Sequence, residues 1–328
     1  MKIVVSPYCD PRATSLTRRL LYTAYARDDK TLRIATHNGK FHADELLAIA
    51  MIKYAVQQAL GWNEKNTIKF EIIRTRNLEK IKLADIAVDV GDGEFDHHST
   101  TNRYPNGVQM SSCGKVLAEV EGDPQVVNLL NSWTLYAVQS IDNGEKSLKY
   151  TNNFFNWVGL MNETYSEMKA SDYENDKPFY LALEMVEILY KRMHKAAREH
   201  ILAQGYLQHC QRHFRQQVLE LPSSSVPWKY FVAFQVPTIK AILCPDATNG
   251  TWTVRWVPKY MGSPDTKLLW PVEWRSEKDA CSGNTTLAAK KYEFGCNFCH
   301  KSLVMANFDS RDHALQAAWF MLHRDGSV

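Results

Sequence analysis

The most constraining feature of this sequence is residues 86–98, where an apolar strand runs directly into a loop dense in metal-type ligands. The apolar run Ile86-Ala87-Val88 predicts a buried strand. The loop that follows carries Asp89, Asp92, Glu94, Asp96, His97 and His98. Carboxylates packed this closely repel one another, and burying them without a counter-charge costs several kcal/mol each. A bound divalent cation removes that cost, so the segment predicts a metal site.

A second polar segment has the same local setting. Residues 33–36 predict a buried strand, and residues 46–60 predict a helix. Between them lie His37, Gly39, which allows a sharp turn, His42 and Asp44, which we expect to cap the following helix. This segment therefore also sits at a junction between a strand and a helix.

The order of elements predicts the fold class. Further strands are expected at residues 70–76 and 85–90, with helical stretches between the strands. This alternation indicates an α/β fold with a doubly wound, mostly parallel sheet. In such sheets ligands bind outside the carboxyl ends of the strands. Both polar segments follow strand ends, so we expect them at the same edge of the sheet.

A chain of 328 residues is long for a single core, and two domains are expected. Residues 1–30 are interpreted as an N-terminal extension and 31–177 as the metal-binding domain. Residues 178–221 predict a long connecting helix. The turn residues of 221–227 then introduce strand-rich runs, which indicate a second, smaller α/β domain over 222–328.

The candidate metal ligands are aspartates and histidines. They are His37, His42, Asp44, Asp89, Asp96, His97, His98 and, from a third place, Asp142. Mixed Asp and His ligation without Cys favours Mn²⁺, with Mg²⁺ or Co²⁺ as alternatives, over structural zinc. This many ligands predicts two ions that share a bridging carboxylate, for which Asp89 at a strand end is best placed. Paired metals of this kind serve phosphoryl chemistry.

These motifs carry a family resemblance. Asp96-His97-His98 after a strand that ends in Asp89 is similar to the DHH phosphoesterase superfamily. Five further motifs resemble the melanocyte proliferating gene (Myg1-type) family: residues 36–45, Arg74-Thr75-Arg76, residues 88–91, Ser111-Ser112-x-Gly114 and residues 141–144. The resemblance runs from about residue 34 to the C-terminus. It is weakest over 150–220, where only the helical character matches.

The resemblance implies a metal-dependent phosphoesterase, in a family described as 3′–5′ exoribonucleases. It implies that one ion is held by His37, His42 and Asp89, and the other by Asp44, Asp89, His97 and Asp142. His98 would lie beside the scissile phosphate, and Asp96 would orient a histidine from behind. The substrate would be contacted by Arg74, Arg76, Ser112, His300 and Arg311.

The C-terminal half follows the family less closely. His300-x-Ser302 and Ser310-Arg311 keep the family's order, and the resemblance implies that His300 and Arg311 close over the metals. Where the family has two glycines, this chain has Ala306-Asn307. Losing both glycines removes backbone freedom where a phosphate backbone would approach closely.

Several patterns have a second interpretation. Cys296-x-x-Cys299-His300 has the spacing of c-type haem attachment, which is not favoured because such proteins are exported and no export signal is recognised. Cys296 and Cys299 with Cys281 could hold zinc, which is not favoured because a fourth ligand at suitable spacing is not evident. The small residues 111–114 at a helix start suit a phosphate, although a simple helix cap is favoured. The basic residues of 191–215 suit nucleic acid, although a solvated helix face is favoured. Most of the nine tryptophans are expected in the core.

Seven scattered cysteines and no apolar signal segment favour an intracellular compartment, cytoplasmic or nuclear. The basic first 27 residues keep a mitochondrial location open. No membrane association is expected, and a homo-oligomer is left open. The predicted function is hydrolysis of RNA or short oligonucleotides by a water that two metals activate. The alternatives are a phosphomonoesterase or pyrophosphatase acting on a small molecule, and a metal-binding regulatory protein with little catalysis.

Overall fold

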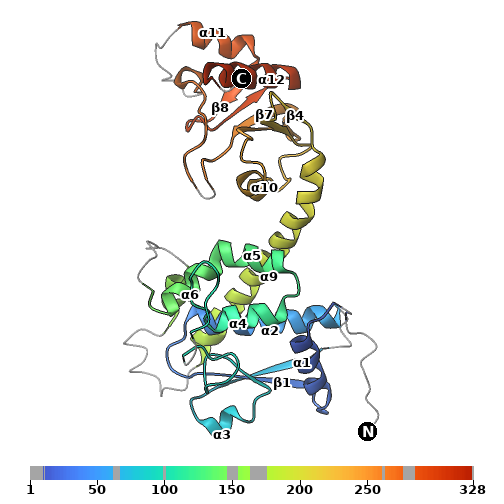
Figure 1. The fold of residues 1–328 in the computed structure, drawn as a ribbon, viewed down its shortest axis with the longest axis vertical. Helices are drawn as coiled ribbons and strands as arrows, with labels where there is room; N and C mark the ends of the chain where they lie inside the picture. The colour runs from blue at the N-terminus through green and yellow to red at the C-terminus, as the bar shows by residue number, and fades with distance from the viewer. Residues whose placement is uncertain are drawn as a thin grey trace. The chain divides into compact units, whose positions relative to one another are not determined.

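The computed structural model describes residues 10, 12–61, 67–98, 101–145, 154–162, 176–260, 263–275 and 285–326. The chain divides into two compact units, Met1–Arg198 and Glu199–Val328 (Figure 1). The division falls inside the longest helix, α9 (Lys177–His209). The predicted domain boundaries at residues 30, 177 and 221 stay predictions.

The first unit contains a small parallel sheet. Its strands are β1 (Thr31–Thr36), β2 (Lys69–Arg74) and β3 (Ile86–Ala87), in the order β2-β1-β3. Both neighbours of β1 run parallel to it. β1 is buried along nearly its whole length, as expected for the central strand of a parallel sheet. The α/β class and the parallel pairing are confirmed.

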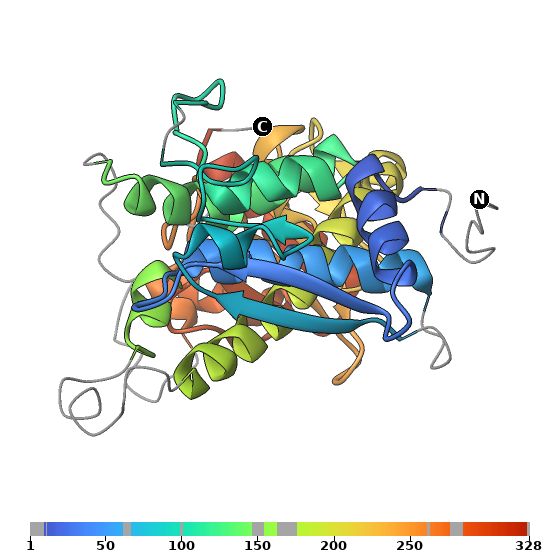
Figure 2. The same ribbon diagram turned by 90° about the horizontal axis from the view of Figure 1, so that it is seen from below.

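Helices make up most of the rest of this unit. They are α1 (Ser15–Tyr25), α2 (Ala43–Leu60), α3 (Leu78–Ile81), α4 (Ser112–Val120), α5 (Pro124–Leu130), the π-helical turn η2 (Asn131–Leu135), α6 (Tyr136–Asp142), α7 (Phe154–Gly159) and α9. α2 runs along one face of β1 and β2 (Figure 2) and also contacts α1, α4, α6 and α7. An apolar helix without a polar face is what such a central position requires.

Two elements differ from their predicted bounds. The strand expected over 85–90 ends at Ala87, because Asp89 adopts a left-handed φ of +56°. The helix predicted over 178–221 ends at His209 and is followed by two short strands. Positive φ angles at Phe214, Arg215 and Gln216 turn the chain between those strands.

The second unit is built on a separate, mixed sheet. Its strands are β4 (Arg212–His213), β5 (Val218–Glu220), β6 (Ala241–Asp246), β7 (Thr251–Trp256), β8 (Cys296–Cys299) and β9 (Met305–Phe308). Their order is β4-β5-β6-β7-β9-β8, and β5 and β6 are parallel while the other pairs are antiparallel. The helices of this unit are α10 (Lys229–Phe234), the 3₁₀ turn η3 (Val272–Trp274), α11 (Thr285–Glu293) and α12 (Arg311–Arg324).

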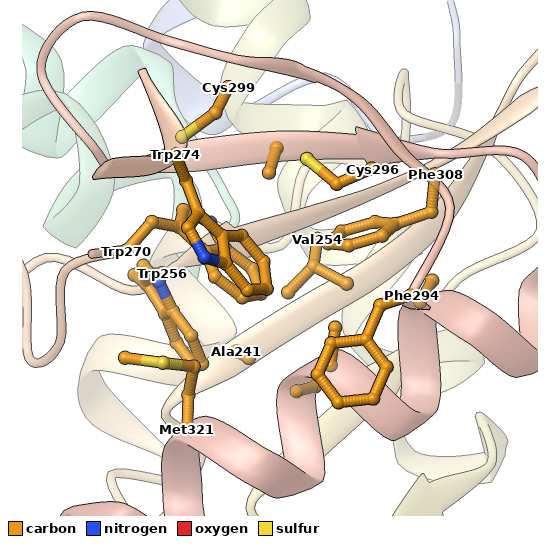
Figure 3. Packing of buried hydrophobic residues seen from close by; sticks show 14 of the residues in the cluster. Ala241, Val254, Trp256, Trp270, Trp274, Phe294, Cys296, Cys299, Phe308 and Met321 are labelled. Atoms are coloured by element: carbon orange, nitrogen blue, oxygen red, sulfur yellow. The ribbon is translucent and has the colours of Figure 1, made fainter. Parts of the chain in front are cut away.

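Tryptophans form the centre of this unit's core (Figure 3). The rings of Trp270 and Trp274 stack with centroids 5.2 Å apart, and Trp256 lies 4.9 Å from Trp270. All three are buried, so the expected packing role is confirmed for them. Cys296 and Cys299 belong to the same core, and burial raises the pKa of their thiols to about 11 and about 12.

Both thiols are buried in this core, which favours the neutral thiol over the thiolate that metal ions bind. Among the described residues, neither cysteine belongs to a group that could hold a metal ion. Cys281, the third cysteine of the zinc interpretation, lies outside those residues. The described helices also include none that is long and apolar enough to cross a bilayer.

Candidate metal centre

Two strand ends bring the two ligand-rich segments of the first unit together. Because β1 and β3 are parallel, with Ile34 opposite Ile86, their loops leave the sheet at the same edge. His37 follows β1 and Asp89 follows β3, and His37 Nε2 lies 3.3 Å from Asp89 Oδ2. The other predicted ligands reach this place from the start of α2, the loop after β3 and the end of α6. They are His42, Asp44, His97 and Asp142.

The backbone of Asp89 places its carboxylate at the centre of the cluster. Its φ of +56° lies in the left-handed region, which aspartate tolerates better than most residues. The turn is closed by a hydrogen bond from Asp89 N to the oxygen of Phe95, 3.2 Å away. The two carboxylate oxygens then face different histidines, since His97 Nδ1 lies 3.2 Å from Oδ1. A carboxylate with this arrangement can bridge two cations.

Three groups of side chains have ligand atoms close enough to share one ion. They are His37, His42, Glu45 and Asp89; Asp89, His97 and His98; and Asp44, His97 and Asp142. Within each group the ligand atoms lie within 4.8 Å of one another. Ligands bound at about 2.1 Å to one octahedral ion are about 3–4 Å apart along neighbouring directions, so the spacing fits a divalent cation.

Buried carboxyl groups dominate this region. Asp44, Glu45 and Asp89 have at most 3% of their surface exposed, and the Asp142 side chain is 7% exposed. Burial and the neighbouring Asp44 and Asp89 raise the pKa of Asp142 to about 9. Burial and the charge of Asp89 likewise raise the pKa of Asp44. Among the described residues, no Lys or Arg forms an ion pair with these four carboxylates.

Histidines partly balance this charge. Burial alone would lower the pKa of His37, but hydrogen bonds to Asp89 and Glu45 outweigh it and raise that pKa to about 10. Burial would raise the pKa of Asp89, but hydrogen bonds from His37 and His97 hold it below its usual value. Divalent cations would perform the same compensation with neutral histidines, which is the protonation state that metal binding requires.

Two buried carboxylate oxygens support this fit. Glu45 Oε2 and Asp142 Oδ2 have no hydrogen-bond partner among the described residues. Asp142 Oδ2 lies 3.2 Å from His97 Nε2, a contact that counts as an ion pair although its angles do not make it a hydrogen bond. A buried oxygen without a hydrogen bond is costly, and coordination to a cation removes the cost. The donor set and its orphaned oxygens therefore fit divalent metal ions.

Asp44 is held by the N-terminus of α4. Its carboxylate accepts hydrogen bonds from Ser112 N at 3.0 Å, from Cys113 N at 2.9 Å and from the Ser111 hydroxyl. The prediction that Asp44 caps α2 is wrong, because His42 occupies that N-cap position. Asp44 instead supplies the anion that the N-terminus of α4 favours.

Asp96 is hydrogen-bonded to His98, an exposed histidine of the cluster. Its Oδ1 accepts hydrogen bonds from His98 Nδ1 at 2.6 Å and His98 N at 3.1 Å, and its Oδ2 accepts one from Asp92 N at 2.9 Å. The His98 ring stacks on that of His97, with centroids 4.6 Å apart, and its side chain is 60% exposed. His98 is thus fixed at one nitrogen and open to solvent.

The predicted substrate residues of the first unit differ in their surroundings. The Arg74 guanidinium pairs with Asp176, donates to the oxygen of Gly39 and lies 4.4 Å from the Phe179 ring centre. Arg76 is exposed just after β2. Ser112 is fully buried, and its hydroxyl lies 3.3 Å from Asp89 Oδ1. Their roles in substrate binding stay predictions.

His300 and Arg311 belong to the second unit. His300 follows β8 and bonds through its backbone N to the oxygen of Met305, at the start of β9, whereas Arg311 lies beyond the other end of β9. Arg311 makes two 2.8 Å hydrogen bonds to Glu220, which also contacts His213. The structure therefore places these two predicted residues at opposite ends of β9, and their roles also stay predictions.

Two buried residues near the centre were missed by the sequence reasoning. Glu45 belongs to the group around His37, and Gln139 accepts a hydrogen bond from Ser111 N through its side-chain oxygen. A signal for Glu45 was available, since a glutamate three residues after a helix N-cap is typical of a capping box. Gln139 had no such signal, because its position depends on how α6 packs against α4.

Comparison with known proteins gives a consistent result. A family profile named for MYG1 exonuclease, described as an uncharacterised protein family (UPF0160), matches residues 33–322. MYG1 exonuclease of Rattus norvegicus is 28% identical over 87% of this chain and 83% of its own length, and that of Homo sapiens is 27% identical over 87% and 84%. MYG1 protein of Chlamydia muridarum is 24% identical over 90% and 98%. No solved structure matches the chain significantly.

Proposed function

This chain belongs to the MYG1 exonuclease family, and from that premise we propose that it is a metal-dependent phosphodiester hydrolase that acts as a 3′–5′ exoribonuclease. The observation that carries the proposal is the buried cluster around Asp89, in which four carboxylates lack any basic partner other than histidine among the described residues. RNA or a short oligonucleotide is the proposed substrate. Mn²⁺ is the proposed metal, with Mg²⁺ or Co²⁺ as alternatives.

In this proposal one ion is held by His37, His42 and Asp89. The other is held by Asp44, Asp89, His97 and Asp142. When bound, two divalent cations supply charge stabilisation for a phosphate and lower the pKa of water so that it can attack. The protein's part is to hold its ligands rigidly, and the hydrogen bonds from α4 to Asp44 do this.

His98 is the proposed proton donor to the leaving oxygen. Because its Nδ1 is bonded to Asp96, its Nε2 is the nitrogen that can carry a proton to the substrate. Burial would raise the pKa of Asp96, but hydrogen bonds from His98 outweigh it and lower that pKa, so the carboxylate stays ionised. This hydrogen bond holds the His98 ring in place, so that Nε2 can act on the leaving oxygen as general acid catalysis requires.

The test is digestion of RNA that carries a label at its 5′ end. With Mn²⁺, the purified chain should shorten this RNA stepwise, and a chelator should stop the reaction. Asp89→Asn should abolish shortening while keeping the fold, because asparagine also tolerates a left-handed φ. Glu94→Ala is the matched control, since Glu94 lies in the same loop with a 58% exposed side chain.

Activity of Asp89→Asn equal to that of the unchanged chain would refute the mechanism. Cleavage of pyrophosphate without any cleavage of RNA would instead favour a phosphatase that acts on a small molecule. Metal binding without turnover on RNA, DNA or pyrophosphate would favour a regulatory protein. Ala306 and Asn307, which replace the family's two glycines, would fit that outcome. Ala306 is buried in the core and Asn307 accepts a hydrogen bond from Thr253, so both residues are part of the packed sheet.

A further inference from the structure

Glu45 is a carboxylate of the first unit with one oxygen that is hydrogen-bonded and one that is not. It is fully buried at the third position of α2. Its Oε1 accepts a hydrogen bond from His42 N at 2.7 Å and lies 3.2 Å from His37 Nε2. Its Oε2 is buried without a hydrogen-bond partner among the described residues.

The neighbouring His42 has the opposite character. Its side chain is exposed, and its ring stacks on Phe155 of α7 with centroids 5.7 Å apart and planes 11° from parallel. Its ring centroid lies 5.8 Å from that of His37. His42 therefore lies at the mouth of the group that it forms with His37, Glu45 and Asp89, and Glu45 lies at its base.

We propose that Glu45 is a fourth ligand of the ion held by His37, His42 and Asp89, and that it also fixes the backbone of His42. This inference rests on the proposed function, which places an ion there. It follows from geometry, because Glu45 offers a ligand atom within 4.8 Å of those of the other three residues. An anionic ligand also accounts for the buried Oε2, which nothing else in the described residues satisfies.

A purely structural role does not explain why residue 45 is a glutamate. A capping box needs one acceptor atom, and a glutamine supplies it as well as a glutamate. A buried glutamate in place of a glutamine adds negative charge beside Asp89, which destabilises the metal-free protein. When a cation binds next to Glu45, the same charge stabilises the bound ion.

The experiment compares Glu45→Gln with Glu45→Ala by calorimetric titration of chelator-treated protein with Mn²⁺. Glu45→Gln keeps the bond to His42 N but removes the charge, so it should weaken one of two Mn²⁺ sites by about 10–100-fold and leave the other within about threefold. Thermal unfolding of the metal-free proteins gives a second readout. Glu45→Gln should unfold at the same or a higher temperature than the unchanged chain, and Glu45→Ala at a lower one.

Glu121→Gln is the matched control, because the Glu121 side chain is only 7% exposed and is bonded to a histidine but lies outside the metal-type groups. It should lower stability and leave both Mn²⁺ affinities unchanged. Two tight Mn²⁺ sites in Glu45→Gln would overturn this inference alone. No Mn²⁺ binding by the unchanged chain would overturn the proposed function as well.

Discussion

Gly114 lies where α4 meets α6, and replacing it by alanine perturbs the support of the metal centre without touching a ligand. A Cβ atom at this position would lie 2.0 Å from Gln139 Oε1 and 2.7 Å from the Tyr104 hydroxyl. The Gln139 side chain cannot move away without a cost. Gln139 is fully buried, and its Oε1 accepts the hydrogen bond from Ser111 N.

The expected cost can be worked from these contacts. Overpacking of a rigid site costs about 1–3 kcal/mol. If Gln139 moves away, the buried Ser111 N–H loses its partner, at a further cost of about 1–3 kcal/mol. The better helix propensity of alanine returns about 1 kcal/mol. We therefore expect Gly114→Ala to lower the free energy of unfolding of the first unit by about 3 kcal/mol.

The measurement is urea unfolding of the full chain followed by circular dichroism. Hydrogen exchange in peptides that cover α4 assigns the transition to the first unit. Gly122→Ala is the matched control, because a Cβ there would find Thr14 Cγ2 as its nearest neighbour at 3.9 Å, an ordinary contact. Gly122→Ala should stay within about 0.5 kcal/mol of the unchanged chain.

A second effect is expected on the metal centre. Ser111 and Ser112 both hold Asp44, so a shifted start of α4 should also weaken Mn²⁺ binding. If Gly114→Ala unfolds at the same urea concentration as Gly122→Ala, the contact between Gly114 and Gln139 does not constrain α4.

Two further predictions concern ion pairs away from the metal centre. The Glu121 side chain is 7% exposed and lies 2.6 Å from His194 and 3.0 Å from Arg198. Glu121→Ala should therefore lower the free energy of unfolding in urea by about 3 kcal/mol. Arg198→Ala should lower it by less than about 1 kcal/mol, because the Arg198 side chain is 48% exposed. Equal costs would contradict the assigned roles. Hydrogen bonds from Arg311 and then His213 lower the pKa of Glu220, so its stabilising effect is present above the ordinary glutamate pKa and is lost as the pH falls through the lowered value. The stability difference between the unchanged chain and Glu220→Gln, followed by tryptophan fluorescence, should therefore shrink on acidification below about pH 4.5, and a constant difference would refute this linkage.

The edge of the sheet at which the site lies was predictable from the sequence. Strands and helices alternate, and parallel strands place their carboxyl ends at one edge, so His37 and Asp89 had to lie near each other. The burial of the tryptophan-rich core in the second unit was also predictable. The pairing of its strands was not, because β9 inserts between β7 and β8 and no local pattern encodes that order.

The finer arrangement of the site depends on contacts between elements distant in sequence. Asp44 was expected to cap its own helix, as local rules favour. It caps α4 instead, because the first N–H groups of that helix, those of Ser112 and Cys113, have no partner within the helix and lie within reach once the two helices pack. The left-handed backbone of Asp89 is likewise fixed by the turn that returns to Phe95. Propensity cannot decide such cases, since tertiary contacts override it.

The position of Asp44 has a consequence for how this chain would recognise a phosphate. A helix N-terminus normally offers its free N–H groups to an anion. In α4 those groups already bind Asp44, and Ser112 turns its hydroxyl toward Asp89. The helix dipole therefore stabilises a metal ligand, and its first N–H groups are not available to the substrate. Phosphate recognition would then fall to groups that face solvent. Among the residues predicted to contact the phosphate in the first unit, His98 and Arg76 are exposed.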